Sequence, residues 1–457
     1  MTSAPRPYAP RFTPRWLVAL TLVAAVVLPT LFPLLVLLLA PLDRQAAVAA
    51  ALRWLGGALG TDLSGPMAQD VGFAAYLLLL AFAVVNFGAI FSGMAVWWER
   101  RIAGRMQSRV GPNRQGFLGF FVWIADAVKF LLKEDLVPAE ADRLLFRAAP
   151  YFVVTGFVLT FVVLPFGESV VVADLDVGVF YVTSVTALVV VGILVSGWSS
   201  NSKWALFGGM RSAAQVISYE IPAGIAVFVP VLMAGTLSMQ GIIRAQGAWP
   251  WEWMAFRNPA ALVAFAVMFV AQLAESNRTP FDLPEAESEL VAGFLSEYSG
   301  FRFALFFLAE YGNIWVLSAL STTLFLGGWQ VPGLPPEAIA AVRGEPIWWG
   351  YQLLSMVVFA AKAIAVANLV IWLRWTLPRI RVDQMMNLSW KYLVPMGFAC
   401  LVFTLFWQLG VAAAPRLELA SGLVLVAAAA VIAAVFVRQV RRNIELVQGD
   451  RVDLSNW

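Results

Sequence analysis

Residues 73–98 read FAAYLLLLAFAVVNFGAIFSGMAVWW, an apolar run without a charged side chain. A helix rises 1.5 Å per residue, so roughly 20 apolar residues cross a hydrocarbon core about 30 Å thick. The run is longer than that and lacks the strict alternation of polar and apolar residues found in membrane β-strands. It therefore predicts a transmembrane α-helix.

Similar apolar runs recur along the whole chain. Hydrophobic residues make up 61% of it and charged residues only 13%, with a mean hydropathy of +0.78, whereas soluble domains are about a quarter charged. This composition predicts an all-α, polytopic membrane helical bundle of about ten spans. The predicted spans cover residues 16–41, 73–98, 150–168, 179–197, 221–239, 258–274, 301–327, 350–373, 393–413 and 419–437.

The charged loops predict the orientation. If residues 1–15 face the cytoplasm, most of the 31 Lys and Arg residues lie on that side, as the positive-inside rule requires. Both termini are then cytoplasmic, and residues 374–391 form a basic cytoplasmic anchor. The first run also follows several arginines, as signal peptides do, but it is longer than their usual apolar core. A retained helix is therefore favoured over a cleaved one.

The residue types exclude several kinds of redox centre. The chain has one cysteine, Cys400, and no histidine. Iron–sulfur clusters generally need four cysteine ligands, and histidine is the commonest protein ligand of haem and zinc. Any electrons must therefore arrive on a partner. The net charge of +3 does not favour nucleic-acid binding.

A basic stretch follows the 73–98 run. Arginines cluster there at positions 100, 101, 105, 109 and 114. Either they anchor the topology and bind anionic lipid headgroups, or they form a docking face and a polar entrance for a lipid-soluble ligand. Residues 117–133 then carry Asp126, Lys129 and Lys133 on one helical face of an otherwise apolar segment. This pattern predicts an amphipathic helix that lies flat in the membrane interface or under a partner.

An acidic stretch over residues 275–302 lies on the side where positive charge should prevail. Two bases, Arg278 and Arg302, face six acids. The acids are Glu275, Asp282, Glu285, Glu287, Glu289 and Glu297. Helix capping explains one or two of them, but not all six. Because packed carboxylates raise one another's proton affinity, the stretch is a candidate for proton uptake and release.

Three further ionisable residues lie in or beside predicted spans. Glu220 stands at the edge of the 221–239 span and is either a helix N-terminal carboxylate facing water or part of the acidic group. Glu310 and Lys362 lie within spans, where charges are costly and are functional candidates by default. The alternative for these two is a purely structural ion pair.

These segments together resemble one protein family. The stretches that carry the resemblance are ERRIAGRMQSRVGPNRQG (99–116), GWSSNSKWALFGGMRSAAQVISYEI (197–221), LAESNRTPFDLPEAESELVAGF (273–294) and RWTLPRIRVDQMMNLSWK (374–391). They are similar to the H subunits of bacterial proton-pumping NADH:quinone oxidoreductase, the counterparts of mitochondrial NADH dehydrogenase subunit 1 in respiratory complex I. The resemblance covers about 73–405 and implies an eight-span core over 73–413. Residues 1–72 and 414–457 would each add one helix, the second with a cytoplasmic tail.

The resemblance implies a function in the bacterial inner membrane. The chain would build the quinone chamber where the membrane arm meets a hydrophilic arm that carries flavin and iron–sulfur clusters, and would itself bind no flavin, haem, metal or cluster. Its partners would be the hydrophilic-arm subunits, the small membrane subunits, the antiporter-like subunits, quinone and lipid.

The resemblance also implies roles for particular residues. The quinone chamber and its entrance would involve Arg100, Arg101, Arg105, Arg109, Arg278, Asp282 and Glu285. A proton relay would run through Glu220, Glu275, Asp282, Glu285, Glu287 and Glu310. The surplus of acids suggests a mechanism of our own: reduction of the quinone head just above residues 275–297 would redistribute protons through Glu275, Asp282, Glu220 and Glu310 and so bias the neighbouring antiporter-like subunits.

Two other functions compete with this one. A homologous membrane subunit of a membrane-bound hydrogenase or formate-hydrogenlyase complex would share the core architecture but serve hydrogen chemistry. A stand-alone secondary transporter would usually show inverted repeats. No convincing repeat relates the halves of this chain.

Overall fold

The computed structural model describes residues 48–49, 51–53, 65–284, 287–334, 346–414 and 416–449. Within these ranges every regular element is a helix and no strand occurs. The all-α prediction is therefore confirmed for the described part of the chain.

Among the described residues, eight helices are long and apolar enough to cross a membrane. They are α3 (Pro66–Met106), α5 (Arg143–Thr160), α6 (Gly178–Ser199), α7 (Lys203–Ala234), α12 (Gly300–Phe325), α14 (Pro346–Thr376), α16 (Val394–Ala413) continuing from α15 (Val382–Asn387), and α17 (Arg416–Gly449). A shorter apolar helix, α10 (Pro259–Glu275), matches the predicted 258–274 span. The predicted helix over 16–41 lies outside the described residues.

Short helical elements connect the long helices. They are η1 (Phe117–Gly119), α4 (Val122–Leu132), α8 (Met239–Ala245), η2 (Pro250–Glu252), α9 (Met254–Arg257), α11 (Glu287–Leu290), η3 (Gly293–Leu295) and the π-helical η4 (Leu388–Leu393). Helix α4 occupies the segment predicted to be amphipathic. Lys133 follows it in extended conformation, so only Asp126 and Lys129 of the predicted charged face lie on the helix.

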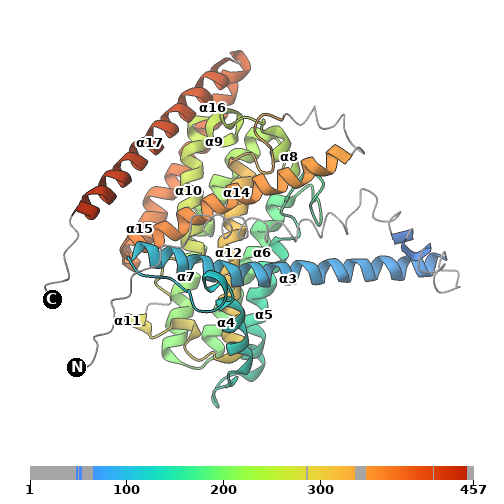
Figure 1. Ribbon diagram of the computed structural model, residues 1–457, viewed down its shortest axis with the longest axis vertical. Helices are drawn as coiled ribbons and strands as arrows, with labels where there is room; N and C mark the ends of the chain where they lie inside the picture. The colour runs from blue at the N-terminus through green and yellow to red at the C-terminus, as the bar shows by residue number, and fades with distance from the viewer. Residues whose placement is uncertain are drawn as a thin grey trace, which may run out of the picture.

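The helices form a bundle with two oblique members. In Figure 1, α5, α6, α7, α10 and α12 stand roughly parallel, whereas α3 and α14 run across them and α17 slants along the outside. Helix α12 packs against α3, α5 and α14. Helices α3 and α14 make few contacts with each other, and both pack mainly on α12.

Helix α3 is longer than a membrane requires. Its 41 residues extend about 60 Å at 1.5 Å per residue, twice the thickness of a hydrocarbon core. A helix of this length tilts or projects beyond the bilayer. Its last turns bring Glu99 beside the loop after α10.

Several helices do not end where the predicted spans do, and two of the differences have a clear structural reason. Helix α7 begins at Lys203, well before the predicted start at 221, because small residues such as Gly208 and Gly209 let it pack closely on its neighbours. Helix α5 ends at Thr160 rather than at 168. The apolar residues after Thr160 form a buried loop in which Phe161, Leu164 and Val170 are fully enclosed, so their hydrophobicity reflects core packing rather than a longer span.

Candidate functional site

A chain of four buried or half-buried charges connects three helices and one loop. Arg278, in the loop after α10, approaches Glu99 of α3 at 3.0 Å and Glu310 of α12 at 2.9 Å. Arg374, near the end of α14, pairs with the other oxygen of Glu99. We call Arg374, Glu99, Arg278 and Glu310 the buried ion chain, because its charges alternate in sign from α14 to α12.

The centre of this chain is shielded from solvent. The side chain of Arg278 is 1% exposed and that of Glu99 is 4% exposed. The guanidinium also lies 4.2 Å from the centre of the Tyr311 ring, a favourable cation–π distance. The guanidinium of Arg278 forms an ion pair with Glu310 that lacks hydrogen-bond geometry. The attraction between these two groups is therefore electrostatic and not that of a directional hydrogen bond.

Arg278 keeps its positive charge in this setting. Burial by itself lowers the pKa of the guanidinium, but the carboxylates of Glu310 and Glu99 outweigh burial and raise the pKa well above its usual value. The surrounding carboxylates therefore have a permanent cation between them.

A small acidic cavity adjoins the end of the buried ion chain. Glu275, at the end of α10, and Glu310 both line it, together with polar Asn277 and Asn313. Its volume is about 40 Å³, enough for a few waters at roughly 10–15 Å³ each. The carboxylate of Glu220 interacts electrostatically with that of Glu275. The structure therefore brings Glu220, Glu275 and Glu310 into one region.

The other predicted acids are less concentrated. Asp282 interacts electrostatically with Glu310 and pairs with Arg379 at 3.4 Å. Glu289 is half exposed and pairs with Arg211. Glu285 lies outside the described residues, as does the side chain of Glu287, whose backbone opens α11.

The basic stretch divides into different roles. Arg100 pairs with Asp126 of α4 at 2.6 Å. Arg101 turns inward and donates to the carbonyls of Leu118 and Pro112, so it holds the turn between α3 and α4. Arg105 is exposed. Only some of these arginines therefore lie on an open polar surface.

A polar pocket and an apolar slot meet at Asp126. The polar pocket, about 860 Å³, is lined by Arg100, Arg109, Asp126 and Lys129 among others. The apolar slot, about 220 Å³, lies between α3, α4 and α12, and Asp126 is the charged residue in its lining. We call the first the basic pocket and the second the α4-side slot.

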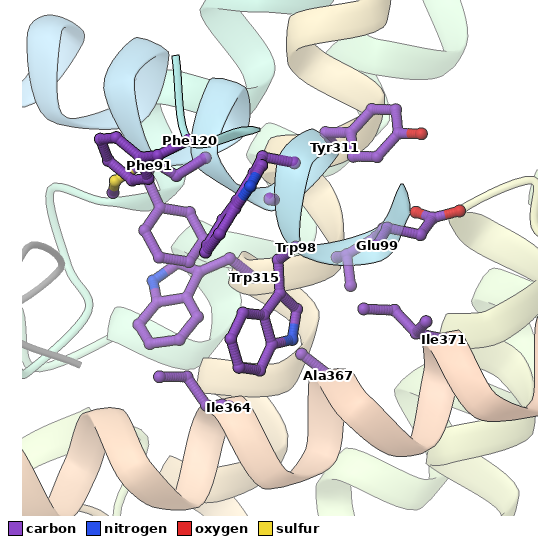
Figure 2. Close-up of a pocket in the computed structure, with 13 residues that line it drawn as sticks. Phe91, Trp98, Glu99, Phe120, Tyr311, Trp315, Ile364, Ala367 and Ile371 are labelled. Carbon is purple, nitrogen blue, oxygen red and sulfur yellow. The ribbon is translucent and has the colours of Figure 1, made fainter. Parts of the chain in front are cut away.

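A second apolar slot lies on the other side of α3, between α3, α12 and α14. Figure 2 shows Trp98 and Trp315 facing it from α3 and α12, with Ile364 and Ala367 below on α14. Glu99 is the charged residue in its lining. We call it the α14-side slot.

The structure does not bring Glu310 and Lys362 together, so the alternative of a structural ion pair between them is wrong. Lys362 donates to the carbonyls of Gly328 and Gln330, just beyond the end of α12, and lies 4.2 Å from the Trp253 ring centre. Glu310 lies about 20 Å before that end at 1.5 Å per residue, and Arg278 is its partner. The charge of Lys362 is stabilised by carbonyls beyond the C-terminus of α12. The charge of Glu310 is balanced separately by Arg278.

Glu99 and Arg374 are the site residues that sequence reasoning missed. Glu99 ends an apolar run and precedes two arginines, which favours the interpretation of an ordinary interfacial charge. Arg374 begins the stretch that was expected to be a basic anchor, whereas it pairs with buried Glu99. An acid at the end of a long apolar run was the available signal.

Within the described ranges, no group of three or more His, Cys, Asp and Glu residues is arranged to hold a metal, and Cys400 is buried inside α16. Long apolar helices, charges buried between them and slots between neighbouring helices define the class of this protein. It is a multi-pass helical membrane protein with an internal ionisable site.

Comparison with known proteins gives the family. Residues 77–405 match the NADH dehydrogenase family. An H subunit of NADH-quinone oxidoreductase from Anaeromyxobacter dehalogenans is 67% identical over 418 residues, which cover 90% of this chain and 100% of the relative. The H subunit of the same name from Chlorobaculum tepidum is 44% identical over 75% of this chain and 93% of its own length. NADH-quinone oxidoreductase subunit 8 of Rhodothermus marinus is 46% identical over 70% and 94%. The chain therefore belongs to the family of NADH-quinone oxidoreductase H subunits, each of which is a membrane subunit of respiratory complex I.

Proposed function

We propose that this membrane subunit of an NADH-quinone oxidoreductase forms the quinone chamber at the junction with the hydrophilic arm and couples quinone reduction to proton translocation. The electrons come from redox centres on partner subunits, and quinone is the substrate that this chain holds. Both termini lie on the cytoplasmic side in this proposal, and the exposed arginines of residues 100–114 face the hydrophilic arm.

The main support for a quinone chamber is that the α4-side slot and the basic pocket meet at Asp126. A quinone has a polar head and an apolar isoprenoid tail, so its route needs an apolar passage that leads to a polar end. The α4-side slot and the basic pocket provide these two environments, and Asp126 lines both. Arg100 and Lys129 bind Asp126 at 2.6 and 3.2 Å, which sets a polar gate between the two spaces.

Filling the α4-side slot is expected to weaken quinone use. Ala127 lines the slot on α4, and Ala127→Trp places an indole where the quinone would pass. The KM for quinone should rise about tenfold, equivalent to about 1.4 kcal/mol of binding free energy. Steady-state quinone reduction by the assembled complex measures this effect.

The matched control is Val128→Trp on the same helix, at a side chain that is 47% exposed and lies outside the slot lining. Reduction of a water-soluble acceptor by the partner module should be normal in both variants. An unchanged quinone KM in Ala127→Trp would remove the α4-side slot from the proposal.

The buried ion chain supports the coupling part of the proposal. One of its ends, Glu310, lines the acidic cavity, and its centre lies in the loop of the acidic stretch. A unit charge that forms 4 Å from another contributes about 4 kcal/mol at an effective dielectric near 20. A charge on the reduced quinone head near this loop would therefore shift the protonation of Asp282, Glu310, Glu275 and Glu220.

Neutralising one acid tests the relay. Glu220→Gln is expected to reduce both quinone reduction and proton pumping, because it removes a proton-binding group while keeping the shape of the side chain. Asp282→Asn should act in the same direction. Quinone reduction and proton uptake are measured together in vesicles that contain the assembled complex.

Glu289→Gln is the control, since Glu289 is half exposed and pairs with Arg211 at 2.7 Å. It should leave both rates near the wild-type values. Wild-type rates in Glu220→Gln and Asp282→Asn as well would show that the acidic region takes no part in coupling.

A further inference from the structure

The α14-side slot is an apolar space that the proposed function does not use. It is separated from the α4-side slot by α3 itself. Phe91 and Trp98 line it from α3, Trp315 from α12, and Ile364 and Ala367 from α14 (Figure 2). Both α3 and α14 are membrane-spanning by length and composition, so the slot opens between two helices that contact hydrocarbon.

The geometry of the bundle explains why side chains leave this space open. Helices α3 and α14 both pack on α12 but contact each other little. One of the ties between them is the hydrogen bond from Trp98 Nε1 to Asn368 Oδ1 at 2.8 Å. Because α3 and α14 pack on α12 but remain apart from each other, a groove lies between them. The small side chain of Ala367 does not fill this groove.

The charged end of the slot is closed to a polar headgroup. Glu99 is the charged residue in the lining, and both of its oxygens are engaged by Arg278 and Arg374. A ligand head that competed for Glu99 would have to break a buried ion pair, which is strongly destabilising. The slot therefore favours a ligand that needs no hydrogen bond.

Size separates the two slots. The α14-side slot has a volume of about 60 Å³, against about 220 Å³ on the α4 side. At roughly 10–15 Å³ for each water-sized sphere, the smaller slot holds a short length of a single hydrocarbon chain. A chain that fills such a void gains dispersion contacts that the aromatic walls otherwise lack.

We propose that the α14-side slot is a binding site for one acyl chain of a membrane phospholipid, inserted between α3 and α14. The headgroup stays in the membrane interface. This site does not depend on the proposed quinone route, because it shares no lining residue with the α4-side slot.

Photolabelling tests this site in the intact complex. A phosphatidylcholine with a diazirine near the end of one acyl chain is incorporated into nanodiscs that hold the assembled complex, and the labelled residues are identified by mass spectrometry. We expect strong labelling of half-buried Ile364 and Ala367 relative to Leu369, which is 39% exposed on another face of α14. A freely mobile bilayer would give the opposite order.

Two variants sharpen the result. Ala367→Trp fills the slot and should abolish labelling at Ile364 while Leu369 is still labelled. Leu369→Trp adds the same indole on the exposed face and should leave labelling at Ile364 unchanged. The wild-type pattern alone decides the question if Ala367→Trp does not assemble.

Three results would overturn the proposal. They are stronger labelling at Leu369 than in the slot, slot labelling that persists in Ala367→Trp, and slot labelling by a diazirine-tailed quinone that phosphatidylcholine does not compete away. The last result would make the slot part of the quinone route instead.

Discussion

Replacing Arg278 with glutamine is expected to destabilise this protein by about 3–5 kcal/mol, the usual cost of removing one partner from a buried ion pair. Glu99 and Glu310 would then lie close together without the cation between them, and Arg374 would be the remaining partner of Glu99. The yield of fully assembled complex and the temperature at which quinone reduction is lost should both fall.

Arg211→Gln is the control for this variant. Arg211 pairs with Glu289 at 2.7 Å, but its side chain is 34% exposed and that of Glu289 is 50% exposed, and pairs of this kind contribute about 0–1 kcal/mol. Arg278→Lys keeps the charge but loses the planar fork that contacts two carboxylates, so it should recover only part of the stability. Equal stability of Arg278→Gln and Arg211→Gln would contradict the importance of the buried ion chain.

Gly208→Ala is the second substitution with a large expected effect. A Cβ atom at Gly208 would lie 2.5 Å from Gly293 Cα and 2.6 Å from Phe294 N. These are backbone atoms, so η3 would have to move away from α7. Overpacking of this kind costs about 1–3 kcal/mol, and it shifts the acidic stretch relative to Glu220. Assembly and quinone reduction should both decrease.

The same helix provides the matched control. A Cβ atom at Gly224 meets no atom within 4 Å, and alanine is about 1 kcal/mol better than glycine inside a helix. Gly224→Ala should therefore leave assembly unchanged or improve it. If Gly208→Ala assembles and works as well as Gly224→Ala, the close contact between α7 and η3 does not position the acidic stretch.

The helical character of the chain was predictable because apolar run length is a local property. The runs around residues 73–98, 301–327 and 350–373 are occupied by helices α3, α12 and α14, as expected. Their ends were less predictable. Helix α7 continues through a glycine-rich segment because Gly208 fits against η3, and the residues after Thr160 are apolar because they are buried. Both facts depend on neighbours that are distant in the sequence.

The partners of the charged residues were not predictable for the same reason. Sequence reasoning selected Arg278, Glu310, Glu275 and Glu220 from their positions in or beside apolar runs, and the structure places these four in one region. A structural ion pair between Glu310 and Lys362 was the alternative that the sequence left open, since both lie within spans, but their depths along the bundle differ. Sequence reasoning left out Glu99, whose role depends on Arg278, 179 residues further along the chain.

Infrared difference spectroscopy of the assembled complex tests the central claim most directly. That claim is that quinone reduction changes the protonation of Glu310, where the buried ion chain meets the acidic cavity. Spectra of the quinone-reduced minus the oxidised state should contain a protonated carboxyl band that is present in the wild type and in Glu289→Gln but absent in Glu310→Gln. A band of full intensity in Glu310→Gln would show that quinone reduction does not change the protonation of Glu310.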